Sequence, residues 1–128
     1  MEIGNKMFVL LLMIFLHIVD DYKLQAGVLN NLKQKEYWEQ NAPDKMYKND
    51  YIWALFMHSF SWSFMIMLPI AFTMKFNIDS VFVIWFGCNI LIHMIVDDLK
   101  ANKKKINLIE DQITHLIQIV LTFIAFIL

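Results

Sequence analysis

Cysteine, arginine and charge are all scarce in this sequence. Its one cysteine, Cys88, stands inside an apolar run, which excludes an intrachain disulfide and a zinc ribbon built on cysteine thiolates. Arginine is absent, and the 11 lysines are nearly balanced by 12 acidic residues, so the chain lacks the basic excess typical of nucleic-acid-binding proteins. Only 18% of the 128 residues are charged, whereas 59% are hydrophobic. A soluble domain of this length could not bury so many apolar side chains, so the composition predicts an integral membrane protein.

Four apolar segments are each near the length of about 20 residues that a helix needs to cross the hydrocarbon of a bilayer. Because backbone groups find no water there, helices are the expected spanning structure. We therefore predict one all-α domain over residues 1–128, an integral membrane bundle of four transmembrane helices at 5–24, 51–74, 80–99 and 108–128. The long polar connection between the first two helices is predicted to contain a short cytoplasmic interfacial helix, with one apolar side made by Val28, Leu29, Leu32 and Trp38.

The lysines predict how the helices are oriented. Only Lys6 and Lys75 lie on one side of the predicted bundle. The connections on the opposite side hold nine lysines: Lys23, Lys33, Lys35, Lys45, Lys48, Lys100, Lys103, Lys104 and Lys105. Since lysine-rich loops remain in the cytoplasm, we predict a multi-pass protein of the inner or plasma membrane with both termini outside.

Ionisable side chains interrupt the apolar helices in a pattern. Such side chains are costly in hydrocarbon, so they are candidates for function. Three histidine–aspartate pairs have a spacing of four residues, which puts both members of a pair on one helix face. The pairs are His17 and Asp21, His93 and Asp97, and Asp111 and His115, and His58 stands alone on the second helix. Because alternate helices run in opposite directions, all seven side chains are expected within a few turns of the cytoplasmic interface.

A bundle that turns these faces inward would gather all seven side chains in one place. Facing helices commonly supply such carboxylate–histidine metal sites. Ligands without thiolate suit Zn, Mn or Fe, and seven candidates exceed what one tetrahedral ion needs, so we expect one or two divalent ions. The alternative is a metal-free polar network in which these side chains bond between helices. Asp20 and Asp98 are interpreted as caps at the wet ends of their helices.

Further polar residues continue the same faces. Lys100 lies seven residues after His93, almost two turns, and so extends that face toward the cytoplasm. It either anchors the helix on lipid headgroups or supplies a fixed cation for an anionic substrate. Asn89, Gln112 and Gln118 are placed to orient the metal ligands.

The polar motifs follow one another in a defined order along nearly the whole chain. They are HxxxD-aromatic-x-L-Q from His17 to Gln25, then His58, HxxxDxxK from His93 to Lys100, and DQxxH from Asp111 to His115. In this combination the chain resembles a family of small phage and bacterial membrane proteins known only as domain of unknown function 3307. The resemblance implies a four-helix membrane protein, often associated with phage, with a metal site and no assigned activity. The chain is also distantly similar to membrane-bound metal-dependent hydrolases that carry histidine and aspartate on helices.

These observations lead to the hypothesis of a membrane-embedded metal-dependent hydrolase that acts at the cytoplasmic face on a phosphoester or a lipid-linked phosphate. Asp97 or Asp111 would serve as general base, and Lys100 would neutralise developing charge. The alternative function is that of a non-enzymatic phage or host membrane factor, for example one for phage exclusion, with a purely structural polar cluster. The expected partners are the lipid bilayer and a lipid or phosphorylated substrate, and assembly into a homo-oligomer is left open.

Overall fold

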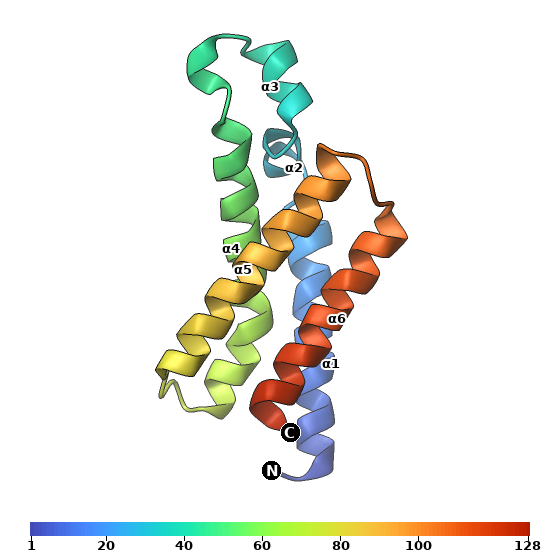
Figure 1. Cartoon of the computed structure of the whole chain (residues 1–128). Helices are drawn as coiled ribbons and strands as arrows, with labels where there is room; N and C mark the ends of the chain where they lie inside the picture. Colours follow the sequence, from blue (N-terminus) through green and yellow to red (C-terminus); the bar gives the residue numbers. More distant parts are fainter.

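The computed structural model describes residues 1–128 and contains helices and their connections, without strands. Its four long helices lie alongside one another as a bundle (Figure 1). They are α1, Ile3–Val19, which continues into the π-helical segment η1, Asp20–Leu24; α4, Asp50–Thr73; α5, Ser80–Ala101; and α6, Leu108–Ile127. The predicted all-α class is confirmed, and each long helix begins and ends within a few residues of its predicted bounds. All four are long and apolar enough to cross a membrane.

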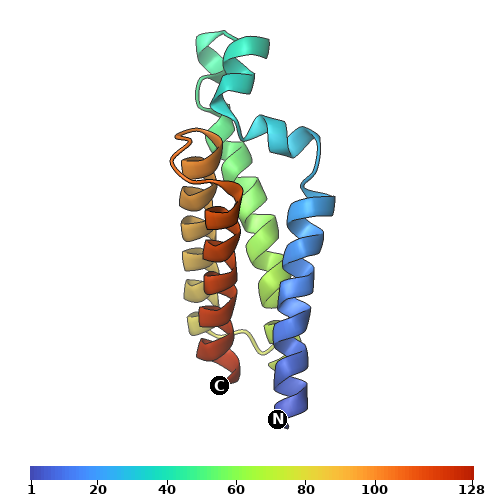
Figure 2. The same ribbon diagram turned by 90° about the vertical axis from the view of Figure 1, so that its right-hand side faces the viewer.

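The two ends of the bundle differ in character. Both termini lie at one end, together with the short α4–α5 connection, and the α1–α4 and α5–α6 connections lie at the other (Figures 1 and 2). α4 packs against both α1 and α5 and has the largest number of buried side chains. The outer surfaces of the helices carry large exposed apolar side chains such as Phe8, Phe15, Ile84 and Leu121.

The connection between α1 and α4 contains two short helices where the sequence predicts one. They are α2, Val28–Leu32, and α3, Lys35–Asn41, followed by a 3-10 turn, η2, at Lys45–Tyr47. The break falls at Gln34, which is extended with φ −94° and ψ 120°. Asn102 at the end of α5 stabilises this break between the two helices. Its amide donates to the carbonyl oxygen of Lys33 at 3.1 Å, and its Oδ1 accepts from the backbone N–H of Lys35 at 2.6 Å.

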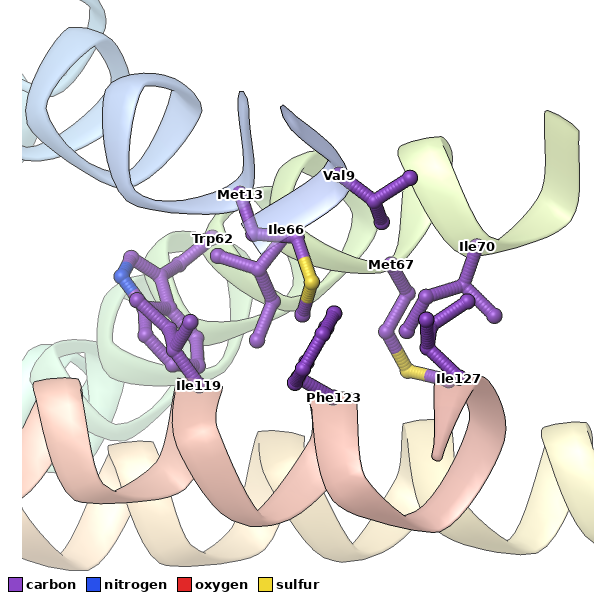
Figure 3. Packing of buried hydrophobic residues seen from close by; sticks show 9 residues of the cluster. All are labelled: Val9, Met13, Trp62, Ile66, Met67, Ile70, Ile119, Phe123 and Ile127. Atoms are coloured by element: carbon purple, nitrogen blue, oxygen red, sulfur yellow. The ribbon is translucent and has the colours of Figure 1, made fainter. Parts of the chain in front are cut away.

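The apolar core occupies the half of the bundle nearer the termini (Figure 3). Side chains from α1, α4 and α6 form it: Val9, Met13, Trp62, Ile66, Met67, Ile70, Ile119, Phe123 and Ile127. Trp62 lies at its boundary, where the ring also meets imidazoles from three other helices. The core therefore fixes the spacing of the helices at one end and leaves the other end to polar side chains.

Candidate metal centre

The four long helices bring the predicted polar side chains together at the end that carries α2. Six of the seven are almost completely buried, and the side chain of Asp21 is 10% exposed. The buried six are His17, His58, His93, Asp97, Asp111 and His115. Neighbouring imidazole centroids are 6.0 Å apart for His17 and His115, 4.0 Å for His115 and His93, and 5.0 Å for His93 and His58. The spacing of the motifs therefore predicted a real convergence of side chains.

Asp97 lies at the middle of this cluster. Its Oδ2 is 2.8 Å from Nε2 of His58, and its Oδ1 is 3.4 Å from Nε2 of His115 and 3.8 Å from Nε2 of His93. The Nε2 atoms of His58 and His93 are themselves 3.1 Å apart. Three ring nitrogens from three different helices thus face one carboxylate, with no backbone group between them.

Two overlapping groups of side chains have the geometry to hold a metal ion. His93, Asp97 and His115 offer ligand atoms within 4.8 Å of one another, and so do Asp21, His58 and His93. His93 belongs to both groups, so the two groups define either one position for an ion or two neighbouring positions that share a ligand. His, Asp and no thiolate is a donor set suited to Zn, Mn or Fe.

Aromatic stacking and side-chain amides fix the orientation of the central imidazoles. The ring of His93 stacks on Trp62, with centroids 4.2 Å apart, and on His115, with centroids 4.0 Å apart, and the rings of Trp62 and His115 also contact each other, with centroids 5.3 Å apart. Nδ1 of His115 is 3.3 Å from Oε1 of Gln118, whose amide nitrogen donates to Asn89 Oδ1 at 3.3 Å. With the Gln118 oxygen turned toward it, Nδ1 of His115 carries a proton, and Nε2 faces Oδ1 of Asp111 at 3.2 Å and Oδ1 of Asp97 at 3.4 Å. Partners of this kind commonly orient metal-binding histidines, as predicted for Asn89 and Gln118.

His17 differs from the other three histidines because both its ring nitrogens have hydrogen-bond partners. Trp62 Nε1 donates to His17 Nδ1 at 2.7 Å, and His17 Nε2 is 3.1 Å from Oε1 of Gln112. Nδ1 therefore accepts, and Nε2 carries the proton. The amide nitrogen of Gln112 then donates to Asp21 Oδ2 at 3.2 Å and Asp111 Oδ2 at 3.1 Å. The structure places His17 beside the ligand atoms, where it positions Gln112 between two carboxylates.

Two lysines neutralise carboxylates of the cluster. Lys33 Nζ donates to Asp97 Oδ2 at 2.7 Å, and Lys100 Nζ donates to Asp111 Oδ2 at 2.7 Å. The position of Lys100 near the cluster agrees with its spacing from His93. Lys33 was predicted only as one of the cytoplasmic lysines, yet it is 6% exposed and is the one buried lysine. No local spacing points to it, because its partner lies 64 residues away.

The side chains of Asp20 and Asp98 bind other side chains. Asp98 lies near the end of α5, where it accepts from the Asn102 side-chain amide at 2.8 Å and lies 3.6 Å from Lys103, while the C-cap residue is Asn102. Asp20 is instead fully buried and accepts from Ser61 Oγ at 2.7 Å and from the Gln25 amide. It follows His17 by three residues and Met13 by seven, so ordinary α-helical periodicity puts it on the buried face of α1, at the point where the π-helical turn η1 begins.

A pocket of about 310 Å³ opens beside the cluster. It is lined from η1, α2, α4, α5 and α6, and its polar lining includes Asp21, Lys33, His58, Asp97 and Lys100. Oδ1 of Asp21 has no hydrogen-bond partner. The pocket thus gives small molecules access to groups that could hold a metal and to two ammonium groups beside them.

Comparison of the chain with models of known protein families, with curated proteins and with solved structures gives no match. The resemblance to domain of unknown function 3307 consequently stays a prediction that depends on the order and spacing of the motifs.

Proposed function

We propose that the protein spans a membrane with its four long helices and that the histidine–aspartate cluster lies near the cytoplasmic face. The exposed apolar surfaces of the helices support insertion, because a soluble protein rarely leaves such large apolar areas in water. The lysine-rich connections lie at the same end as the cluster, which supports the cytoplasmic placement.

This topology can be tested with single cysteines in a Cys88→Ser background. Lys45→Cys, in the exposed η2 turn, is expected to react with a membrane-impermeant thiol reagent only after the cells are opened. Asn77→Cys, in the exposed α4–α5 connection at the opposite end, is expected to react in intact cells. The reverse pattern of labelling would place the cluster at the outer face.

We propose further that the cluster binds one or two divalent metal ions. The ligands are the Nε2 atoms of His58, His93 and His115 with the carboxylate of Asp97, and Asp21 completes the side that faces the pocket. The buried acceptor Asp21 Oδ1, which has no hydrogen bond, supports this assignment, and so does the approach of three imidazole Nε2 atoms to the Asp97 carboxylate. Buried acceptors without a donor are costly, and a cation bound among them would remove that cost.

The function that this geometry supports best is hydrolysis of a phosphoester or a lipid-linked phosphate. The observation that carries it is the pocket lined by three of the proposed ligands, namely Asp21, His58 and Asp97, together with the two lysines. A divalent ion in such a site lowers the pKa of bound water and polarises a phosphoryl oxygen. A purely structural metal site needs no such access, since structural ions are enclosed by their ligands.

The protein's own groups can be assigned roles in this reaction. Asp97 lies among the proposed ligands, and Asp21, which lines the pocket and has an Oδ1 without a hydrogen bond, is the carboxylate that we assign to accept a proton from water. Asp111, the other general base predicted from the sequence, does not line the pocket. It accepts a hydrogen bond from Lys100, which does line it. The Lys100 ammonium lines the pocket and is placed to neutralise charge on a phosphoryl group.

A metal-free structural network is the second candidate function for the cluster. The pairs of Lys33 with Asp97 and of Lys100 with Asp111 favour it, because each already neutralises a buried carboxylate. In that case the protein is a non-enzymatic phage or host membrane factor, and the chelation of metals leaves its stability unchanged.

Hydrolysis can be measured with the purified protein in lipid nanodiscs that contain phosphatidate. We expect release of inorganic phosphate with added Zn²⁺ or Mn²⁺, loss of release with a chelator, and loss of release in Asp21→Asn. The control is Asp98→Asn, one residue from Asp97 but facing Asn102 and Lys103. Equal release from the parent with and without chelator, or no release with either ion, would contradict a metal-dependent phosphatase acting on this class of lipid.

A further inference from the structure

Lys33 is the one buried residue in the segment 26–49, which connects η1 to α4. It follows α2, and no residue of α2 or α3 is buried. Asn102 binds the backbone at Lys33 O and at Lys35 N, on both sides of Gln34. The connection is therefore attached to the end of α5 in a way that directs one ammonium group toward Asp97, five residues earlier on the same helix.

The Lys33 ammonium group binds Asp97, the same carboxylate that is proposed as a ligand of the metal ion. Oδ2 of Asp97 accepts from Lys33 Nζ at 2.7 Å and lies 2.8 Å from Nε2 of His58. A divalent cation bound at this carboxylate and the ammonium group repel each other, because they carry charge of the same sign at short range. Metal binding thus weakens the hold of Asp97 on Lys33.

The Lys33 ammonium group can also lie in the pocket beside Asp97, which Lys33 lines. Lys33 and Lys100 both line it, and each contributes an ammonium group with three donors on a flexible stem. Two ammonium groups beside a bound cation form a surface that suits a group with several anionic oxygens, such as a phosphate.

We propose that Lys33 and Lys100 form the anion-binding side of the site, and that Lys33 leaves Asp97 for the phosphate group of the substrate once a metal ion occupies that carboxylate. This inference depends on the proposed metal site. Without the metal ion, Lys33 neutralises Asp97. With the metal ion bound, Lys33 binds the substrate.

The phosphate group could belong to a soluble phosphoester or to a lipid headgroup. Tyr22 and Leu108 line the same pocket and are 54% and 56% exposed, so its wall includes apolar surface open to the surroundings of the bundle. Both sources share the chemistry that the two lysines recognise, and the experiment distinguishes them.

The test measures phosphate and metal binding separately in the parent and in Lys33→Met. The protein is placed in phosphatidylcholine nanodiscs, Zn²⁺ affinity is measured by competition with a chelating dye, and inorganic phosphate is titrated by calorimetry with and without Zn²⁺. We expect Lys33→Met to weaken phosphate binding about tenfold or more, the size expected for loss of a hydrogen bond to a charged group. We expect its Zn²⁺ affinity to be equal or higher, because the competing cation is gone.

Two matched variants separate this role from a structural one. Lys35→Met removes a lysine two residues away that is exposed and pairs with Glu39 at 3.8 Å, and it should change neither affinity. Lys33→Arg keeps the charge and should restore most of the phosphate binding. If Lys33→Met weakens both affinities and Lys33→Arg restores neither, Lys33 is only structural and the inference is overturned.

The remaining outcomes distinguish this inference from the proposed function. Zn²⁺ binding by the parent with phosphate affinity unaffected by Lys33→Met would overturn the inference and leave the metal site standing. Phosphate binding that depends on Lys33 in a parent that binds no Zn²⁺ would leave an anion site and overturn the metal site, and binding of neither would overturn both. Nanodiscs containing phosphatidate should abolish the phosphate titration if the ligand is a lipid headgroup, and should leave it unchanged if the ligand is a soluble phosphoester.

Discussion

Asp97→Asn is expected to lower metal affinity by more than the 10–100-fold that is typical for loss of a partner outside the ligand shell. The carboxylate faces the Nε2 atoms of His58, His93 and His115, and asparagine keeps its shape while removing the charge that a cation requires. Bound Zn²⁺ or Mn²⁺ is measured by elemental analysis of the protein purified in detergent. Asp98→Asn, the neighbouring residue at the wet end of α5, should retain its metal.

The same substitution is expected to destabilise the protein for a separate reason. It leaves the buried Lys33 ammonium without its anionic partner, and breaking a buried pair in this way costs about 3–5 kcal/mol. The double variant Asp97→Asn, Lys33→Met removes both charges and should recover much of the thermal stability without recovering the metal. Full metal content in Asp97→Asn, or recovery of metal in the double variant, would show that Asp97 is not a ligand.

His93→Ala and His17→Ala are expected to differ strongly in metal binding, although both histidines have the same spacing to an aspartate. His93 belongs to both groups of candidate ligands and is fully buried against Trp62 and His115, so its loss should remove nearly all bound metal. His17 binds Trp62 and Gln112 instead. Its loss should weaken metal affinity by about 10–100-fold, as for other residues that position a ligand from outside.

The comparison is made by competition of each variant with a chelating dye, with thermal unfolding as a check that both remain folded. Losses of equal size would show that His17 is a ligand, as its spacing alone predicts. Retention of metal by His93→Ala would remove the shared ligand on which both candidate ion positions depend.

The helices and the convergence of polar side chains could be predicted from the sequence because both depend on local spacing. The length of each apolar segment fixes a helix, and a spacing of four residues puts His93 and Asp97 on one face of α5. The buried faces of Asp111 and His115 on α6 follow in the same way. Their positions along the helices then place them at one depth in the bundle.

The connections within the site could not be predicted in the same way because they depend on tertiary contacts. The burial of Lys33 requires the clamp that Asn102 forms on the chain 69 residues away. The spacing of Asp20 from His17 puts it on the buried face of α1, but its partner Ser61 lies 41 residues away on α4. Trp62 has no ionisable group, so the sequence does not mark it as part of the site. Only the structure shows that its N–H donates to Nδ1 of His17, which is then not free to bind a metal.

The central claim, that the buried cluster binds a divalent metal, is tested most directly by the metal content of the purified protein. The protein is produced with Zn²⁺ and Mn²⁺ in the medium, extracted in detergent without chelator, and analysed for metal per chain beside His93→Ala prepared in the same way. We expect about one or two ions per chain in the parent, because the cluster has enough ligands for one or two ions, and almost none in the variant. A parent as free of metal as His93→Ala, with thermal stability that a chelator does not change, would contradict the central claim and leave the cluster as a structural network.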